Sequence, residues 1–214
     1  MEERATGIIL RTRRLTETSL IAHWLTQDHG RVATVAKGAL RPKSPFRGKL
    51  DLFYSAEFSY SRSRRSELHT LKEMRSIETH ARLREELGYV QQASYAAALI
   101  EQTTETDTPL PGVFSIFLGF IEILPIGPPL QRTIFALELK LLGELGLQPQ
   151  ANEPALSPGA RQIMNRLARE DWPVLDKLKL SDAQELELRQ YLHGFLIYHL
   201  GKFPLSRAGA LHTG

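Results

Sequence analysis

The sequence predicts an α+β protein in which a domain of five β-strands precedes an all-helical domain. Up to about residue 78, short runs of β-branched and aromatic residues are separated by turn residues, a pattern typical of strands. From about residue 80, apolar residues recur at helical spacing instead. The chain has 214 residues and 42% of them are hydrophobic, which is enough to bury a core in each part. We therefore expect a β domain over residues 1–79 and a helical domain over residues 80–214.

The β domain is predicted from its strands and turns. The expected strands are 5–10, 20–26, 31–36, 50–62 and 68–77. The tripeptide Asp28-His29-Gly30, between the second and third strands, is a hairpin turn signal. Pro42 and Pro45 cannot lie in a central strand, so the segment 40–48 is expected to be an exposed connection. Five short strands within residues 1–79 favour a small closed barrel or sandwich.

The helical domain is predicted from apolar periodicity and capping residues. The expected helices are 81–104, 113–124, 131–145, 158–169 and 182–201. Ser157 before Pro158 is typical of a helix start, and Ser181 with Gln184 predicts a capping box. The phenylalanines of the second helix recur at every third residue, and we expect them to be core residues: Phe114, Phe117 and Phe120.

The composition excludes several kinds of chemistry. The chain has no cysteine, which excludes thiolate zinc sites, iron–sulfur clusters and disulfides and fits a reducing cytosol. His193 and His199 are six residues apart and so lie on different helix faces, unlike a pair of metal ligands. No phosphate-binding glycine loop, dinucleotide-binding turn or serine nucleophile motif is present. We expect no metal, no cofactor and no enzymatic activity, unless folding assembles a site from residues far apart in the sequence.

The ends and apolar segments of the chain predict a soluble protein. The stretch Met1–Arg4 lacks the basic start and apolar run of a signal peptide. The most apolar segment, 113–130, is interrupted by Glu122 and three prolines, so it is not expected to cross a membrane. We expect a cytoplasmic protein without membrane contact.

The charge is distributed unevenly. Residues 1–75 contain 15 Lys and Arg and 8 Asp and Glu, a net charge of +7, whereas residues 76–214 have a net charge of −4. Six basic residues and no acidic residue lie between positions 31 and 49: Arg31, Lys37, Arg41, Lys43, Arg47 and Lys49. A basic first part on an acidic remainder indicates that the first part meets a polyanion.

A second cluster supports a nucleic-acid interface. If 58–64 is a strand, Phe58 and Tyr60 share a face with Arg62 and Arg64. Single-strand binders combine cations with aromatic rings, each stacked base contributing about 1–3 kcal/mol. A merely solvated basic face is the alternative, and Phe46 could stack on a base or anchor its loop. The predicted DNA-binding residues are Arg13, Arg14, Arg31, Lys37, Arg41, Lys43, Phe46, Arg47, Lys49, Tyr60, Arg62, Arg64 and Arg65.

Several short motifs together resemble one known family. They are 7–12 (GIILRT), 17–21 (ETSLI), 29–31 (HGR), 35–39 (VAKGA), 41–44 (RPKS), 67–73 (ELHTLKE), 135–142 (FALELKLL), 145–147 (LGL), 199–201 (HLG) and 206–207 (SR). In this order and spacing they are similar to the RecO family of recombination mediators, across nearly the whole chain. Many relatives carry a four-cysteine zinc module after the Leu-Gly-Leu segment. Here residues 146–155 are short and lack cysteine, so the resemblance is to a variant without that module.

The resemblance implies an OB-fold barrel followed by a helical domain, acting in DNA repair and homologous recombination. Such proteins bind single- and double-stranded DNA, anneal complementary strands and, with RecR, help RecA load onto DNA coated with single-strand binding protein. They engage the acidic, hydrophobic tail of that protein through the helical domain, where Arg132, Lys140 and Arg161 are available here. A location at the bacterial nucleoid follows. The alternatives are an OB-fold adaptor whose basic face binds an acidic partner protein, and a nuclease or hydrolase.

Overall fold

The computed structural model describes residues 2–175 and 177–212. The chain forms two compact units, each assembled from two segments. The barrel unit comprises Met1–Ala81 and Thr103–Ser115, and the helical unit comprises Arg82–Gln102 and Ile116–Gly214. The boundary expected between residues 79 and 80 stays a prediction.

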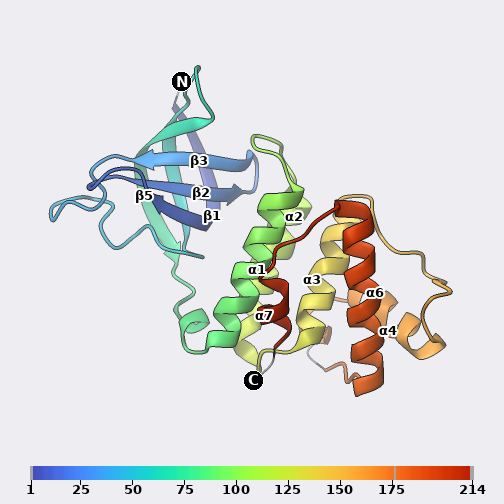
Figure 1. Ribbon diagram of the computed structural model, residues 1–214. Helices are drawn as coiled ribbons and strands as arrows, with labels where there is room; N and C mark the ends of the chain where they lie inside the picture. The colour runs from blue at the N-terminus through green and yellow to red at the C-terminus, as the bar shows by residue number, and fades with distance from the viewer. Residues whose placement is uncertain (1, 176, 213–214) are drawn as a thin grey trace. The chain divides into compact units, whose positions relative to one another are not determined.

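The barrel unit contains a closed five-stranded barrel (Figure 1). Its strands are β1 (Glu2–Arg14), β2 (Leu20–Thr26), β3 (Gly30–Ala36), β4 (Ser55–Ser61) and β5 (Leu68–Glu78). They pair in the order β1-β2-β3-β5-β4, with β3 and β5 parallel and the other pairs antiparallel. This is the arrangement of an OB-fold, and it confirms the fold class expected from the sequence.

The hairpin between β2 and β3 forms where the sequence predicted it, whereas two strand limits differ. Thr26 pairs with Gly30, whose φ of 67° is the left-handed conformation that glycine adopts readily. β1 extends beyond the expected 5–10 at both ends. β4 begins at Ser55 and not at residue 50, because Phe53 has a φ of 65° and its N–H donates to the carbonyl of Ile9 (2.8 Å). The chain therefore turns before β4.

Large aromatic side chains fill the barrel. Trp24 and Phe58 stack with ring centroids 4.2 Å apart, and Trp24, Phe58 and Tyr60 are all buried. The indole N–H of Trp24 donates to the hydroxyl of Thr34 at 2.9 Å, so its polar atom is satisfied inside the core. Of the residues that alternate with these, Glu57 on β4 is exposed, whereas Ile21 and Leu25 on β2 are also buried.

The second part of the chain is helical, as predicted. Its elements are η1 (Ala81–Arg84), α1 (Leu87–Thr103), α2 (Pro111–Ile123), η2 (Leu124–Ile126), α3 (Gln131–Glu144), α4 (Pro158–Arg169), α5 (Trp172–Leu175), α6 (Asp182–Leu200) and α7 (Arg207–Leu211). The three phenylalanines of α2 are buried, and the caps at Ser157 and Ser181 form as expected. Sequence analysis missed the short helices α5 and α7.

The single helix predicted over residues 81–104 is wrong at its start. Residues 81–84 form a 3-10 turn, in which the N–H of Glu85 donates to the carbonyl of Arg82 at 3.1 Å. The α-helix begins only at Leu87. In the two stretches that the structure describes, no helix combines the length and the apolar character needed to cross a membrane.

A buried ionic contact joins three helices of the helical unit. Glu138 on α3 is fully buried and Arg207 on α7 is almost so. The guanidinium donates from Nε to Oε1 (2.6 Å) and from Nη2 to Oε2 (2.9 Å) of Glu138, and the hydroxyl of Tyr95 on α1 donates to Oε1 at 2.6 Å. Burial beside this carboxylate raises the pKa of Tyr95 well above its ordinary value.

Candidate nucleic-acid interface

The segment between β3 and β4 begins with a series of tight turns, which we call the basic loop (residues 37–49). Backbone hydrogen bonds close successive turns, from Arg41 N–H to the carbonyl of Gly38 (3.0 Å) and from Lys49 N–H to that of Phe46 (3.1 Å). Gly38 and Gly48 have φ angles of 67° and 72°, which a residue with a Cβ would adopt only with strain. The loop is therefore shaped by its own backbone and is not part of the sheet, as predicted.

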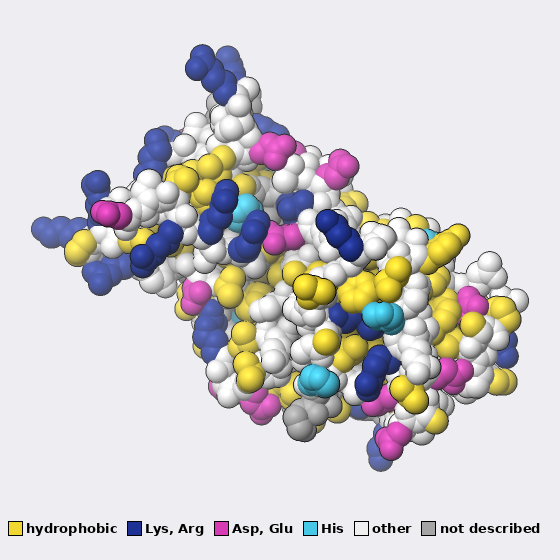
Figure 2. Space-filling view, in the orientation of Figure 1, with side chains coloured by type: hydrophobic (Ala, Val, Ile, Leu, Met, Phe, Trp, Pro, Cys, Tyr) yellow, Lys and Arg dark blue, Asp and Glu magenta, His cyan; other side chains and the backbone are white. Residues whose placement is uncertain are grey.

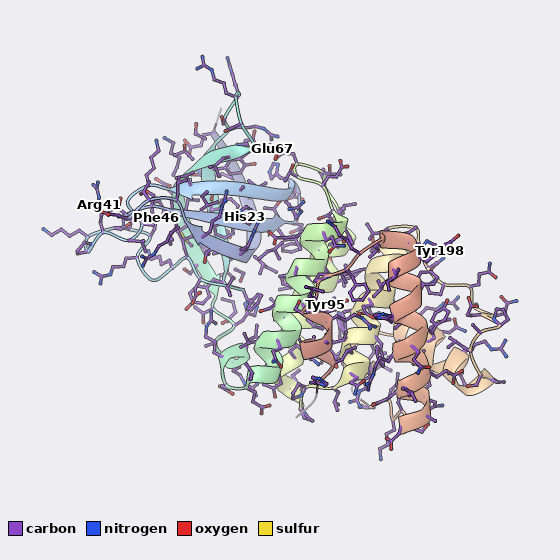
Figure 3. All side chains as sticks on the ribbon, in the orientation of Figure 1. His23, Arg41, Phe46, Glu67, Tyr95 and Tyr198 are labelled. Atoms are coloured by element: carbon purple, nitrogen blue, oxygen red, sulfur yellow. The ribbon has the colours of Figure 1, made fainter. Side chains whose placement is uncertain are left out.

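Buried side chains fasten the basic loop to the barrel. Ala39, Phe46 and Leu50 belong to the barrel core, and Phe46 is only 7% exposed. The N–H of Leu40 donates to the carbonyl of Thr18 (2.9 Å) in the β1–β2 turn. Figure 3 shows Arg41 pointing away from the barrel and Phe46 lying close to it. The loop thus has a fixed base from which its polar side chains project.

The cations of the basic loop are exposed and unpaired with acids. The exposed set is Lys37, Arg41, Lys43, Arg47 and Lys49. In the described parts of the chain none of these five forms an ion pair with a carboxylate; Arg47 makes only a long 3.4 Å contact to the carbonyl of Pro42. Their charges are therefore available to an anionic ligand.

A cavity lies beside the basic loop, against the β1–β2 turn. It has a volume of about 350 Å³, and its lining includes Leu15, Val35, Lys37 and Arg41. The exposed Arg13 and Arg14 stand at the end of β1, directly before this turn. One end of the barrel therefore combines exposed cations, this cavity and the side chain of Leu15, which is 48% exposed.

The predicted residues do not form one cluster. Glu2 pairs with Ser61 and Leu20 pairs with Ala36, so the β4–β5 connection lies at the opposite end of the barrel from the basic loop. That connection carries the exposed Arg64 and Arg65. Figure 2 shows dark blue side chains gathered at both places. The structure thus divides the predicted set between two ends.

Two aromatic residues of the predicted DNA-binding set, Tyr60 and Phe46, lie in the barrel core, and for Phe46 this is the anchoring alternative. The Tyr60 ring is fully buried and stacks on His69, and its hydroxyl donates to Oε2 of Glu3 at 2.7 Å. This hydrogen bond is the main reason why the pKa of Glu3 lies below its usual value. The alternation along β4 is as predicted, but the aromatic face points inward. Neither ring presents a face to a base in this structure.

Two other predicted cations hold a segment of their own chain. The guanidinium of Arg31 donates from Nε to the hydroxyl of Thr104 at 2.8 Å. Arg62 contacts Asp107 (2.9 Å) and Glu3 (3.3 Å). The N–H of Asp107 donates in turn to the carbonyl of Arg31, and a Cβ on Gly30 would lie 2.1 Å from the Thr108 carbonyl oxygen. Arg31 and Arg62 therefore fix residues 104–108 against β3.

The outer face of β1 and β2 contains cations that sequence analysis missed in part. Arg11 on β1 lies opposite His23 on β2. Arg13, two residues further along β1, lies opposite Ile21. Burial, together with Arg11, Arg13 and Arg31, lowers the pKa of His23 to about 4. Where Figure 3 labels His23, Figure 2 shows its side chain among dark blue ones. Arg11 belongs to the run Arg11-Thr12-Arg13-Arg14, so its spacing could have identified it.

We expect an NMR titration of His23 to show a midpoint at about pH 4, with the imidazole neutral at pH 7. The folded pKa is below the ordinary value of about 6.5, so the unfolded chain binds the proton more readily and stability falls as pH drops from 6.5 towards 4. Replacing Arg11 by alanine should raise the midpoint. A wild-type midpoint near 6.5 would contradict this description of the face.

A groove in the helical unit combines apolar and basic side chains. One cavity of about 600 Å³ is lined by Ile116, Leu139, Lys140, Met164 and Arg169, among others. A second cavity of about 500 Å³ shares Arg169 and adds Arg161 and Arg166. We call the two together the α3–α4 groove. Lys140 donates to the carbonyl of Glu170 (2.7 Å) and burial lowers its pKa, whereas Arg169 is exposed. Among the described residues, no three His, Asp or Glu side chains are placed to hold a metal ion.

Comparison with known proteins relates both parts of the chain to one family. Residues 1–80 match the model for the "Recombination protein O N terminal" domain, and residues 84–156 match that for the "Recombination protein O C terminal" domain. A protein of Pelotomaculum thermopropionicum named DNA repair protein RecO is 33% identical over 232 residues, covering 92% of this chain and 89% of its own. The chain belongs to the RecO family. The family match thus includes the basic loop and the α3 side of the α3–α4 groove, whereas the α4 side lies beyond residue 156.

Other RecO proteins align over different lengths. The DNA repair protein RecO of Bacillus subtilis (strain 168) is 32% identical over 146 residues, 68% of this chain and 56% of its own length. That of Ralstonia nicotianae is 32% identical over 212 residues, 89% of this chain and 76% of its own. The chain therefore matches little more than half the length of the Bacillus relative.

Proposed function

We propose that this chain is a DNA repair and homologous recombination mediator that binds single- and double-stranded DNA and anneals complementary strands, without catalytic turnover. The observation that supports this most directly is the basic loop, where five exposed cations project from a base anchored in an OB-fold barrel. Relatives named as DNA repair proteins add support. Residues 1–79 would supply the DNA contacts and residues 80–214 the contacts with other proteins.

Annealing by such a surface needs no active site. Two DNA strands repel each other through their phosphates, and cations that neutralise both strands reduce that repulsion. Base pairing then provides the free energy. In the proposed mode, Arg13, Arg14 and the basic loop contact phosphates, and the cavity beside Leu15 receives part of a base or sugar. Phe46 only holds the loop in place.

The α3–α4 groove fits the tail of single-strand binding protein. An acidic and hydrophobic tail needs an apolar floor and a basic rim, and the groove offers Ile116, Leu139 and Met164 together with Arg161 and Arg169. Of the three cations available in the sequence, Lys140 and Arg161 line these cavities and Arg132 does not. We include RecR as a partner, RecA as an indirect one and the nucleoid as the location.

The deciding experiment is annealing of complementary oligonucleotides, bare and coated with single-strand binding protein. The mediator role requires faster annealing than the uncatalysed reaction on both substrates. An Arg161→Ala/Arg169→Ala variant should lose activity on coated strands and keep it on bare strands, because it removes only two cations of the groove, the half-buried Arg161 and the exposed Arg169. If this variant annealed both substrates as fast as the wild type, the groove would not be part of the proposed site. If the wild type did not accelerate annealing, the proposed function would be wrong.

An adaptor that docks an acidic protein on the barrel is the second candidate, and the same basic loop is compatible with it. An adaptor would bind one polypeptide tightly and DNA only weakly, and it would not accelerate annealing. Incubation of DNA with magnesium or manganese tests the nuclease alternative, which requires cleavage products.

A further inference from the structure

A row of aromatic rings runs along the carboxyl-terminal half of α6. Tyr191 and Phe195 have centroids 5.7 Å apart, Phe195 and His199 4.2 Å, and His199 and Tyr198 4.9 Å. We call these four side chains the ring row. Spacing of three and four residues places them on neighbouring positions of one helix surface. Contacts between the rings restrict their rotamers, so their faces are presented in an ordered way.

The ring row ends in an exposed tyrosine. Tyr198 is 84% exposed, and Figure 3 shows it projecting outward from α6. Close to it in the sequence, Ile197 is 46% and Leu205 96% exposed. At the other end, the hydroxyl of Tyr191 donates to Glu153 at 3.0 Å. Exposed apolar residues that gather on one surface are typical of interaction sites, whereas single ones are common.

The chain segment that carries the ring row has charges of one sign. The sequence from Leu188 to Gly214 contains no acidic residue. Of its cations, Arg207 is bound to Glu138 and Arg189 donates to Gln131. Lys202, two residues after the end of α6, is exposed, and His193 and His199 add polar rings that carry no negative charge. Glu153 is engaged by the Tyr191 hydroxyl at one end of the row, whereas the other end offers the 84% exposed Tyr198 and the exposed ammonium group of Lys202. That end suits an anionic ligand that has flat rings.

We propose that the ring row binds single-stranded nucleic acid, with bases stacking on Tyr198 and its neighbours and a phosphate contacting Lys202. Single-strand binders combine these elements, and stacking on an aromatic side chain tolerates any base. A second copy of this chain fits this surface less well. In a symmetric contact the cations of residues 188–214 would face the same cations of the other copy, with no acidic residue in that segment to pair with them.

The inference rests on the proposed function and extends it. Annealing requires two strands, and the ring row gives the helical unit a contact for a strand in addition to that of the basic loop. The two sites bind by different interactions. The basic loop contributes five cations and no exposed aromatic ring, whereas the ring row contributes stacking and one cation. Binding at the ring row should therefore depend less on salt than binding at the loop.

The test uses the full chain with Tyr198→Trp, whose indole reports directly on stacking. We expect an oligo(dT) titration to quench its emission, after subtraction of the wild-type signal from Trp24 and Trp172. A Tyr198→Ala/Lys202→Ala variant should bind the oligonucleotide about tenfold more weakly, in line with the loss of one stacked base and one phosphate contact. Ile126→Ala removes a 64% exposed apolar side chain of the same unit and should change nothing.

The outcomes separate this inference from the proposed role of the basic loop. Quenching that persists when the four loop cations 41, 43, 47 and 49 are alanine supports the ring row even if the loop proposal fails. Emission that does not respond to oligo(dT) overturns the inference. Emission that changes with protein concentration alone identifies a second copy as the occupant, and quenching only by an apolar peptide identifies a protein partner; either result also overturns it.

Discussion

Changing Arg41, Lys43, Arg47 and Lys49 together to alanine is expected to lower the affinity for a single-stranded oligonucleotide by at least about tenfold at low salt and to flatten its salt dependence. Each phosphate neutralised on a single strand contributes a slope of about −0.7 to log K against log salt, so losing four contacts would reduce the slope by up to about 3. The fold should persist, because all four side chains are exposed while Phe46 and Leu50 remain as anchors.

Fluorescence anisotropy over a series of salt concentrations measures both quantities. The matched comparison uses two double variants, Lys43→Ala/Arg47→Ala in the basic loop and Arg64→Ala/Arg65→Ala in the β4–β5 connection. Each removes two exposed charges from one end of the barrel. A larger effect of the second would show that DNA binds at the opposite end, and equal slopes for the wild type and the quadruple variant would show that the loop does not contact phosphates.

Replacing Glu138 by alanine is expected to reduce the free energy of unfolding of the helical unit by about 3–5 kcal/mol. The change leaves the guanidinium of Arg207, 4% exposed, without its carboxylate and removes the acceptor of the Tyr95 hydroxyl. A buried charge without a partner is costly because the interior cannot replace its hydration. By contrast, removing Glu57 from its exposed pair with Arg75 should cost less than about 1 kcal/mol.

Urea denaturation followed by Trp172 emission measures this loss, in a Trp24→Phe background so that the barrel does not contribute. The triple variant Glu138→Met/Arg207→Met/Tyr95→Phe should recover most of the stability, because it removes all three polar groups and fills a similar volume. If Glu138→Ala proved no more destabilising than Glu57→Ala, the contact would not be buried in solution.

The sequence predicted the order and type of the elements because the information was local. β-Branched runs, the turn at residues 28–30 and the caps at Ser157 and Ser181 each determine structure within a few residues. The errors occur where distant contacts decide. Phe53 turns the chain before β4 through a hydrogen bond to Ile9, which no local pattern reveals. The helix α7 is too short for periodicity, and Arg207 is bonded to a residue 69 positions away.

The candidate site was predictable in its charges and not in its aromatic residues. Alternation along β4 showed that Phe58 and Tyr60 share a face, but only closure of the barrel determines that this face points inward. In the sequence nothing distinguishes Arg31 and Arg62 from the cations of the basic loop. In the structure Arg31 donates to Thr104 and Arg62 forms an ion pair with Asp107. The neutral form of His23 likewise depends first on its burial and then on three arginines from the two neighbouring strands β1 and β3.

The barrel unit is discontinuous, because residues 103–115 belong to it although α1 separates them from β5. During synthesis the amino-terminal strands leave the ribosome well before Thr104 and Asp107 do, so Arg31 lacks its contact with Thr104, and Arg62 its contact with Asp107, until α1 has been made. In a nascent chain halted at residue 81, Arg62 would pair with Glu3 alone. Completion of the segment 104–108 then engages Arg31 and Arg62 within the barrel unit, while the five cations of the basic loop stay exposed.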